Sequence, residues 1–432
     1  MFEPGAEAMP PEELAGLQLT RLRALVDRLL ADGGLQGRRL KDAGIGSGRD
    51  VTGLADLARL PAVTKRDLWD SYPFGLAGVP PEEMAAVHGS SGTGGRPTLV
   101  AYTRADLALW ARMCARALAS AGAGPGSIVH NAYGYGLFTG GIGFHQGAIE
   151  VGATVVPASG GMTHRQVTLI RDLRPAFLAC TPSYAIRLGE ALAEAGVRPG
   201  LRAGLFGAEP WSEQMRRHIQ DLLGLRALDV YGLSEVIGPG VAAECLEADG
   251  LHVNEDHFLV ETIDPETGGP AGDGVPGELV FTSVTRQAMP LLRYRTGDIS
   301  SLRHGPCPCG RTLVRMCKVA GRRDDMLVIR GVNVYPSEIE RVVLADGAVS
   351  PDYLLVVDER GDARQLVACL EYRAGAAAGP SEADLASRLQ AELGLRVQVR
   401  LLPAGTVPRT EVGKAVRVVR WSAGEPPLPG LT

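Results

Sequence analysis

The segment HGSSGTGGRPT, residues 88–98, concentrates hydroxyl-bearing and turn-forming residues in one short stretch of the chain. Ser90, Ser91 and Thr93 offer hydroxyl donors, and the glycines beside them let backbone N–H groups approach a ligand closely. Such a loop suits a ligand with many oxygens, although an ordinary surface loop has the same composition. It is not a Walker A loop, because no Gly-Lys-Ser/Thr follows. The segment alone therefore leaves phosphate binding and a surface loop as alternatives.

A second group of residues has the types that bind a transition metal. Cys245 and His252 are separated by six residues, and Cys307 and Cys309 flank a proline in the distant motif CPCG. Three thiolates and one imidazole would complete a closed tetrahedral Zn²⁺ site. The spacing is not that of a common zinc finger, so redox cysteines and ordinary packing remain alternatives, with His257 as the competing histidine.

The composition excludes several classes of protein. Apolar residues make up 45% of the 432 residues and charged residues 22%, as in globular proteins, and the length favours two or more domains. A net charge of −5 argues against nucleic acid as the main partner. No apolar run approaches the roughly 20 residues that cross a bilayer, and the N-terminus lacks a secretory apolar region. Seven scattered cysteines do not suggest a disulfide framework, so we expect a cytoplasmic protein.

The elements that must position these residues begin with strands and helices that alternate between residues 103 and 233. This alternation predicts a doubly wound, mostly parallel sheet covered by helices on both faces. Ligands of such sheets bind at the carboxyl ends of the strands. The loops at 132–138, 207–211 and 231–235 each follow a predicted strand, so we expect them to share one rim and one site.

Two further changes of pattern suggest the domain organisation. Short β-rich runs with turns fill residues 237–320 and predict an antiparallel or barrel-like part. After the motif GRRDDM, strands and helices follow in the order βαββαβ, which is typical of a small α+β domain of ferredoxin-like type. We therefore predict a large α/β N-terminal domain over residues 1–323 and a small C-terminal domain over residues 324–432.

Several motifs, taken in order, carry a resemblance to a known family. They are GSSGTGGRPT, AYGYGLFTGGIGFHQGA, FGAEPWSEQMR, DVYGLSEVIGPGVAAEC, MPLLRYRTGDI, GRRDDMLVIRGVNVYPSEIE and PRTEVGKAVRV. Together they resemble the phenylacetate–coenzyme A ligase group of the adenylate-forming enzymes, from about residue 60 to residue 420. The resemblance implies a reaction in two steps. A carboxylate attacks the α-phosphate of ATP to give an acyl-adenylate and pyrophosphate, and coenzyme A thiolate then displaces AMP.

The resemblance also implies roles for individual residues. Glu235 resembles the carboxylate that holds Mg²⁺ against the phosphates, an arrangement that this cation commonly adopts. Asp298 resembles the acid that accepts both ribose hydroxyls, and Arg322 resembles the arginine on the ribose and phosphate side. Asp324 is the implied hinge of a swinging C-terminal domain. Lys414 resembles the lysine that meets the carboxylate and the α-phosphate during adenylation.

The complete implied site is larger. Catalytic roles fall to Lys414, Glu235 and Thr93. The implied nucleotide-binding residues are Ser90, Ser91, Gly92, Gly94, Gly95, Arg96, Gly207, Ala208, Glu209, Pro210, Asp229, Tyr231, Gly232, Asp298, Arg322 and Asp324. The implied acyl pocket consists of Tyr135, Gly136, Phe138, Gly143, Ile237 and Pro239, with Tyr231 beside it. The family pattern usually has a threonine where this chain has Gly94, so one side-chain contact to phosphate is in doubt.

The identity of the acid and of the acceptor stays open. Aromatic and small residues without a buried cation favour a flat apolar acid, phenylacetate or a related aryl acid, although Tyr135 and Phe138 also suit core packing. The acceptor implied by the resemblance is coenzyme A, with a carrier protein or an amine as the alternative. A non-catalytic nucleotide-binding homologue would be expected to lack Glu235, Asp298 or Lys414, and this chain has all three. A homodimer is one assembly that the sequence allows.

Overall fold

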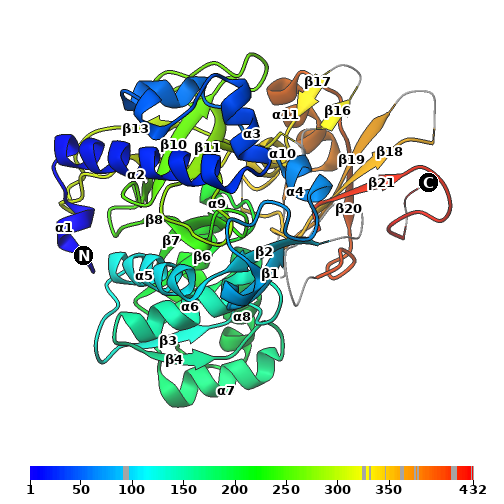
Figure 1. Cartoon of the computed structure of the whole chain (residues 1–432). Helices are drawn as coiled ribbons and strands as arrows, with labels where there is room; N and C mark the ends of the chain where they lie inside the picture. The colour runs from blue at the N-terminus through cyan, green and yellow to red at the C-terminus, as the bar shows by residue number, and fades with distance from the viewer. Residues whose placement is uncertain are drawn as a thin grey trace. The chain divides into compact units, whose positions relative to one another are not determined.

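The computed structural model describes residues 1–90, 97–323, 327–329, 332–345, 347–360, 364–373, 376, 379–409, 416–429 and 431 (Figure 1). The chain divides into two compact units. The first unit contains residues 1–180, 199–208 and 225–319, and the second contains residues 181–198, 209–224 and 320–432. Two helices that lie between strands of the first unit in the sequence, α8 (Pro182–Glu194) and α9 (Glu213–Leu223), thus belong to the second unit.

The largest sheet of the first unit has the strand order β13-β14-β9-β8-β7-β6-β5-β3-β4. Its strands are β3 (Ile128–Asn131), β4 (Thr154–Pro157), β5 (Phe177–Cys180), β6 (Ala203–Gly207), β7 (Arg226–Leu233), β8 (Gly238–Glu244), β9 (Leu251–Val253), β13 (Leu302–Arg303) and β14 (Arg315–Met316). Strands β3 to β7 pair in parallel, as the alternating pattern predicts. From β7 onward the pairing is antiparallel, because the short connection to β8 reverses the chain direction.

The β-rich stretch is distributed over two sheets. Strands β8, β9, β13 and β14 extend the large sheet, whereas β10 (Phe258–Ile263), β11 (Gly277–Ser283) and β12 (Tyr294–Ser300) pair with one another in antiparallel fashion. The predicted antiparallel pairing of residues 237–320 is confirmed, and its strands are shared between two sheets rather than closed into one barrel. Side chains from both sheets meet in one buried cluster that includes Val241, Val253, Phe258 and Phe281.

Helices of the first unit position the strand ends (Figure 1). They are α1 (Pro4–Glu7), α2 (Pro11–Asp32), α3 (Leu35–Asp42), α4 (Lys65–Asp70), α5 (Arg104–Ser120), α6 (Thr139–Glu150) and α7 (Thr163–Leu173), with 3₁₀ turns at Gly48–Asp50, Leu54–Arg59 and Pro81–Glu83. Helix α5 begins at the capping box of Thr103 and Asp106. It packs closely on α6, because a Cβ at Gly147 would lie 2.4 Å from the Cβ of Cys114.

The second unit contains a small α+β sheet of order β20-β19-β18-β21. Its elements are β15 (Gly321–Arg322), β16 (Leu327–Ile329), β17 (Val332–Val334), α10 (Pro336–Val343), β18 (Leu354–Asp358), β19 (Gln365–Glu371), α11 (Glu382–Leu393), β20 (Gln398–Leu402) and β21 (Val418–Trp421). The predicted α+β architecture is confirmed, with one difference in pairing. The expected first strand, β16, forms a hairpin with β17, and β21 pairs in parallel with β18. The predicted boundary adjoins residues 324–326, which lie outside the described residues, and it stays a prediction.

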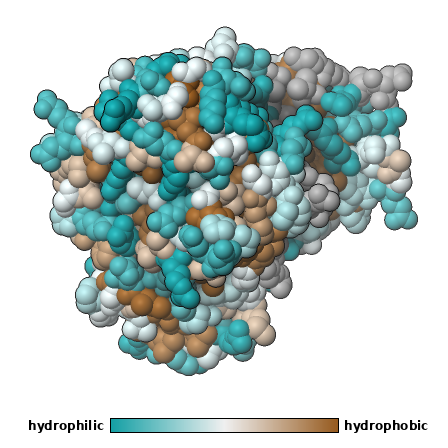
Figure 2. Space-filling view, viewed as in Figure 1, coloured by the Kyte–Doolittle hydropathy of each residue, from teal (hydrophilic) through white to brown (hydrophobic). Residues whose placement is uncertain are grey.

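On the face drawn in Figure 2, polar residues cover most of the surface and apolar residues form scattered patches. Among the described residues, no helix combines the length and the apolar character needed to cross a bilayer.

Candidate active site

The two stems of the predicted phosphate loop are paired strands, β1 (Ala86–Ser90) and β2 (Thr98–Tyr102). Ser90 pairs with Thr98 in their antiparallel register, so both ends of the loop are fixed at one place. The Ser90 hydroxyl donates a 2.9 Å hydrogen bond to Oε1 of the buried Glu235. The structure therefore brings together two residues that the sequence assigns to phosphate and to Mg²⁺. The remaining loop residues, Ser91, Gly92, Thr93, Gly94, Gly95 and Arg96, lie outside the described residues.

Glu235 lies in the tight connection between β7 and β8. This connection needs glycines, because a Cβ at Gly232 would lie 1.9 Å from the carbonyl oxygen of Gly238. The buried Tyr102 hydroxyl donates to the carbonyl of Ile237 at 3.0 Å and lies 3.4 Å from that of Ser234. Burial holds the pKa of Tyr102 well above its usual value, so its hydroxyl remains a donor. The backbone on both sides of Glu235 is thus held by a residue that sequence reasoning missed.

Arg286 holds the same connection and was also missed. Its fully buried guanidinium donates to the carbonyls of Glu235 and Val236, the latter at 2.9 Å, and to the carbonyl of Ala101 at 3.1 Å. The guanidinium also lies 4.8 Å from the ring centroid of Tyr102. No motif could have identified this residue, because its partners are backbone groups far away in the sequence.

A third residue missed by sequence reasoning is Lys65, on helix α4. Its Nζ lies 3.9 Å from Glu235 Oε1, and the lysine side chain is 25% exposed. The carboxylate assigned to Mg²⁺ therefore has both a hydroxyl donor and an ammonium beside it.

Asp298 and Tyr231, two residues assigned to the nucleotide, are in direct contact. The Tyr231 hydroxyl on β7 donates a 2.7 Å hydrogen bond to Asp298 Oδ2 on β12. The ring of Tyr231 stacks on Phe281 at 5.9 Å, and the Asp298 amide donates to Thr296 Oγ1 at 2.9 Å. The Tyr231 side chain is therefore held by Asp298 and by Phe281, at the strand end that leads to Glu235.

The motif GAEPW begins at the end of β6. Gly207 must be a glycine there, because a Cβ would lie 2.2 Å from the carbonyl oxygen of Val230. Ala208 follows with a φ of 71°, in the left-handed region. Glu209 accepts the Ser183 amide at 2.7 Å within the second unit.

Pro210, Arg322 and Asp229 are the remaining described residues predicted to bind the nucleotide, and their roles stay predictions. Pro210 and Arg322 belong to the second unit, Arg322 on β15. Asp229 lies on β7, where its amide donates to Glu244 Oε2 at 2.7 Å. Asp324 and Lys414 lie outside the described residues, so their predicted roles stay predictions.

The predicted acyl-pocket residues form two groups. Tyr135, Gly136 and Phe138 lie in the loop between β3 and α6, where Phe138 is 54% exposed. The Tyr135 hydroxyl accepts a 2.8 Å hydrogen bond from Asn131, and burial raises the pKa of Tyr135 to about 12. This loop therefore offers an aromatic surface with a hydroxyl that stays protonated at neutral pH.

The second group of acyl-pocket residues surrounds Trp110. A Cβ at Gly143 would lie 2.6 Å from the Trp110 ring, and the carbonyl of Pro239 accepts its indole N–H at 3.1 Å. Ile237 is fully buried in the core cluster that contains Trp110. The contacts of this group are those of core packing, and its role toward the acid stays a prediction.

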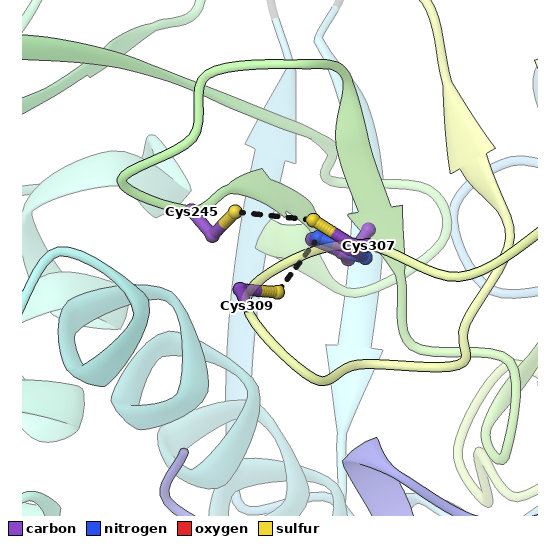
Figure 3. Close-up of side chains that lie close together, drawn as sticks. Cys245, Cys307 and Cys309 are labelled. Atoms are coloured by element: carbon purple, nitrogen blue, oxygen red, sulfur yellow. Dashed lines mark hydrogen bonds between the residues drawn. The ribbon is translucent and has the colours of Figure 1, made fainter.

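The three predicted thiols and the imidazole converge (Figure 3). Cys245 follows β8, His252 lies on β9, and Cys307 and Cys309 lie between β13 and β14. The Cys245 and Cys307 sulfurs are 3.8 Å apart, and Cys309 Sγ is 3.5 Å from His252 Nε2. A tetrahedral Zn²⁺ with ordinary bond lengths requires edges of about 3.8 Å between sulfurs and about 3.5 Å between sulfur and nitrogen. The donor set therefore fits Zn²⁺ in chemistry, two of its separations match these edges, and all four ligand atoms lie within 4.8 Å of one another.

Burial raises the pKa of the Cys245 thiol to about 12 and that of the Cys307 thiol above its usual value, whereas His252 and Cys309 are shifted toward their metal-binding forms. His257, the competing histidine, instead contacts Thr285 Oγ1 at 2.8 Å. Burial and then Arg311 lower the pKa of His252 to about 4, so its imidazole is neutral, as a metal ligand must be. Burial opposes thiolate formation at Cys309, but the backbone and guanidinium of Arg311 bring the net pKa of its thiol below the usual value.

Arg311 also connects the cysteine cluster to the beginning of the chain. Its Nε donates to Glu7 Oε2 at 2.7 Å, and its Nη1 lies 3.6 Å from Cys309 Sγ. The next residue, Thr312, donates its amide to the Glu7 carbonyl and its hydroxyl to the Met9 carbonyl. The segment that contains α1 is thus fixed against the loop between β13 and β14.

Comparison with known proteins agrees with this geometry. The AMP-binding enzyme family matches residues 41–289, and the AMP-binding enzyme C-terminal domain matches residues 331–420. A phenylacetate–coenzyme A ligase of Thermus thermophilus is 48% identical over 97% of this chain and 99% of its own length. The phenylacetate–coenzyme A ligase of Escherichia coli is 44% identical over 95% and 96%, respectively.

Solved structures extend the comparison to the fold. A 2-hydroxyisobutyryl-CoA ligase in its postadenylation state superposes with a TM-score of 0.89, at 29% identity over 96% of this chain and 91% of that chain. The same ligase in its thioesterification state gives a TM-score of 0.72. The fold is that of the adenylate-forming enzymes, with a large N-terminal and a smaller C-terminal domain. The chain belongs to the AMP-binding enzyme family and, within it, to the phenylacetate–coenzyme A ligase group.

Proposed function

We propose that this protein ligates an aromatic carboxylic acid, phenylacetate or a related aryl acid, to coenzyme A at the expense of ATP. The proposal rests mainly on the contacts made at the carboxyl end of strand β7. There Tyr231 contacts Asp298, and four residues later Glu235 contacts Ser90 beside the phosphate loop. Residues suited to ribose and to phosphate are thus held at one strand end, the usual ligand position in such a sheet.

The reaction follows from the chemistry of an acid and ATP. A carboxylate oxygen of the acid forms a bond to the α-phosphorus while the bond to the bridging oxygen of pyrophosphate breaks. In the second step the coenzyme A thiolate attacks the acyl carbon, and AMP leaves with the electron pair of the C–O bond. The chain's residues bind and orient the charged groups: Asp298 accepts from the ribose hydroxyls, and Ser90 holds Glu235 beside the phosphate loop.

Glu235 is the residue that would hold Mg²⁺ in this site. Its carboxylate is buried, accepts from Ser90 and has its backbone fixed by Tyr102 and Arg286. A hard cation bound through one carboxylate and phosphate oxygens fits this single, rigidly held group. The bound cation would neutralise charge on the phosphates.

The preference for an aryl acid rests on the relatives and on the loop after β3. The relatives from T. thermophilus and E. coli are phenylacetate–coenzyme A ligases. Tyr135 and Phe138 supply aromatic surface, and Gly136 has a φ of 135° that only glycine adopts readily. We infer that this loop lies against the ring of the acid.

We also propose that the C-terminal domain, residues 324–432, swings at Asp324 between the two steps and brings Lys414 to the site for adenylation only. The solved 2-hydroxyisobutyryl-CoA ligase, which exists in a postadenylation and a thioesterification state, supports this proposal by analogy. We further expect free coenzyme A to be the acceptor. We also expect a cytoplasmic location and a homodimer.

The cysteine cluster is proposed as a structural Zn²⁺ site. Four protein ligands with tetrahedral spacing leave no open position for a substrate, which separates this site from the chemistry at Glu235. Its role would be to fix the loop between β13 and β14.

A pyrophosphate-release assay tests the proposed function. We expect release with ATP, Mg²⁺ and phenylacetate or a substituted aryl acid, and a smaller rate with 2-hydroxyisobutyrate. Mass spectrometry then compares thioester formation on free coenzyme A with acyl transfer to a phosphopantetheinylated carrier protein. Release without any thioester on coenzyme A would favour the carrier protein or an amine, and no release with any acid would refute the proposal.

A further inference from the structure

Lys65 is positioned by the same framework that positions the site. Helix α4 begins at the capping box of Thr64 and Asp67. The preceding residue, Val63, donates its amide to the Arg293 carbonyl at 3.1 Å and accepts the Arg295 amide at 2.8 Å. This bridge attaches the start of α4 to the beginning of β12, the strand that carries Asp298. The helix is therefore anchored to the nucleotide side of the site.

The surroundings of the Lys65 ammonium point to the phosphate loop. Nζ lies 3.9 Å from Glu235 Oε1 and 5.7 Å from the ring centroid of Trp69. The Trp69 indole N–H in turn donates to Thr98 Oγ1 at 2.8 Å. Ser90 and Thr98 are paired residues on the two stems of the loop. Ser90 contacts Glu235 and Thr98 contacts Trp69, so each stem contacts a residue that lies beside the Lys65 ammonium.

A cation that can reach phosphate would offset part of the negative charge of ATP in this part of the site. ATP is strongly anionic, and the Arg286 guanidinium is already engaged with backbone carbonyls and fully buried. Lys65 is different, because its side chain is 25% exposed and its described carboxylate partner, Glu235, is the group proposed to bind Mg²⁺. Glu235 would hold a divalent cation, and the Lys65 ammonium, which that cation would repel, would then be attracted to phosphate oxygens.

We propose that Lys65 is an ATP-binding residue of this enzyme, which pairs with Glu235 before the nucleotide arrives and then contacts oxygens of the β- and γ-phosphates. The inference rests on the proposed function, since it assumes that ATP occupies this site. Lys65 lies in the first unit, whereas Lys414 lies in the predicted C-terminal domain. The two lysines would thus contact different phosphates: Lys65 would hold the departing pyrophosphate, and Lys414 would act at the α-phosphate.

The test compares the binding of ATP and of AMP, which lacks the β- and γ-phosphates, by calorimetry in the presence of Mg²⁺. Lys65→Met should weaken ATP binding at least about tenfold, the scale of one lost charge-assisted contact, and leave AMP binding unchanged. Lys65→Arg, which keeps the charge, should give an intermediate ATP affinity. Thioester formation from supplied acyl-adenylate should keep the wild-type rate, because that step involves neither terminal phosphate.

Arg66→Met is the matched control. Arg66 is the next residue on α4, its side chain is 84% exposed, and it pairs only loosely with Asp70 at 3.5 Å. This variant should bind both nucleotides like the wild type. Equal weakening of ATP and AMP in Lys65→Met, or no weakening of either, would overturn the role of Lys65 while leaving the proposed function intact. Failure of the wild-type protein to bind ATP would instead refute the proposed function itself.

Discussion

Ser90 and Glu235 are 145 residues apart in the sequence, and a 2.9 Å hydrogen bond joins their side chains. The bond connects the first stem of the phosphate loop to the connection between β7 and β8. The carboxylate proposed for Mg²⁺ is therefore held at the stem of the loop by a contact within the protein. Preorganisation of this kind lowers the cost of assembling a charged site when the substrate arrives.

Lys414→Ala should separate the two half-reactions. Adenylation brings two anions together, so loss of a preorganised ammonium should slow it by at least about 10²-fold. Thioester formation from supplied acyl-adenylate should be nearly unchanged, because the proposed swing removes Lys414 from the site. The measurement is single-turnover kinetics of each step. An equal loss in both steps, or in neither, would show that Lys414 is not the adenylation lysine.

Arg286→Met should affect both stability and the use of Mg²⁺. The variant leaves three buried carbonyls without their donor, which should cost about 2–4 kcal/mol of unfolding free energy. Because the same carbonyls fix Glu235, the Mg²⁺ concentration for half-maximal pyrophosphate release should rise.

Two further variants control the Arg286 experiment. Arg286→Lys keeps the charge but cannot reach the three carbonyls together, so it should show the shift in Mg²⁺ dependence with a smaller loss of stability. Arg104→Met, at an exposed arginine of the first unit, should change neither quantity. A normal Mg²⁺ dependence in both Arg286 variants would mean that Arg286 only stabilises the core.

Metal analysis should find about one Zn per chain in protein purified without chelators. The double variant Cys307→Ser, Cys309→Ser should lose the metal and unfold at a lower temperature, because two of four ligands are removed. Cys317→Ser, at a half-buried cysteine outside the cluster, should keep the metal and the unfolding temperature of the wild type. The zinc interpretation fails if the wild-type protein contains no metal or if the double variant is as stable as the wild type.

Glu371 should make the stability of the second unit depend on acid pH. Its buried carboxylate accepts from the amides of Gly405 and Val407 and from Arg409. Burial opposes ionisation, but these donors, with Arg409 first, bring the net pKa of Glu371 below its usual value. The stabilisation is therefore complete above the unfolded pKa, about 4.5, and is lost as pH falls through the lower folded value.

The Glu371→Gln variant tests this assignment. At neutral pH it should be less stable by about 1–3 kcal/mol, and the difference from the wild type should shrink as the pH falls below about 4.5. Glu392→Gln, which removes an exposed pair with Arg341, should cost less than about 1 kcal/mol at any pH. The prediction is checked by chemical unfolding at several pH values. A difference that does not change with pH would contradict it.

Local patterns predicted much of the fold. The alternation of strands and helices gave the parallel strands β3 to β7, and turn-bounded β-rich runs gave β10 to β12. The pattern could not assign α8 and α9 to the second unit, because periodicity reports which face of a helix is buried and not the partner. Nor could it tell that β21 rather than β16 pairs with β18, since strand pairing is a long-range contact.

In the candidate site, too, the sequence indicated some residues and gave no sign of others. Motifs predicted nucleotide-site roles for Ser90, Glu235 and Asp298, and ligand types predicted the cysteine cluster; the structure brings Ser90 to Glu235 and the four cluster residues to one another, while their roles stay predictions. Arg286 and Lys65 carried no signal, because an arginine bonded to carbonyls and a lysine beside a carboxylate look in the sequence like ordinary surface residues. Only the folded chain brings them to Glu235.

The attachment of Glu7 and Met9 to Arg311 and Thr312 has a consequence for the order in which the protein is made. The first helix emerges early from the ribosome, yet these partners are synthesised some 300 residues later. Until then the N-terminal segment can be held by the pair of Glu3 with Arg116 of α5, but the pair of Glu7 with Arg311 cannot form. Completion of the first unit is thus tied to translation of its last strands.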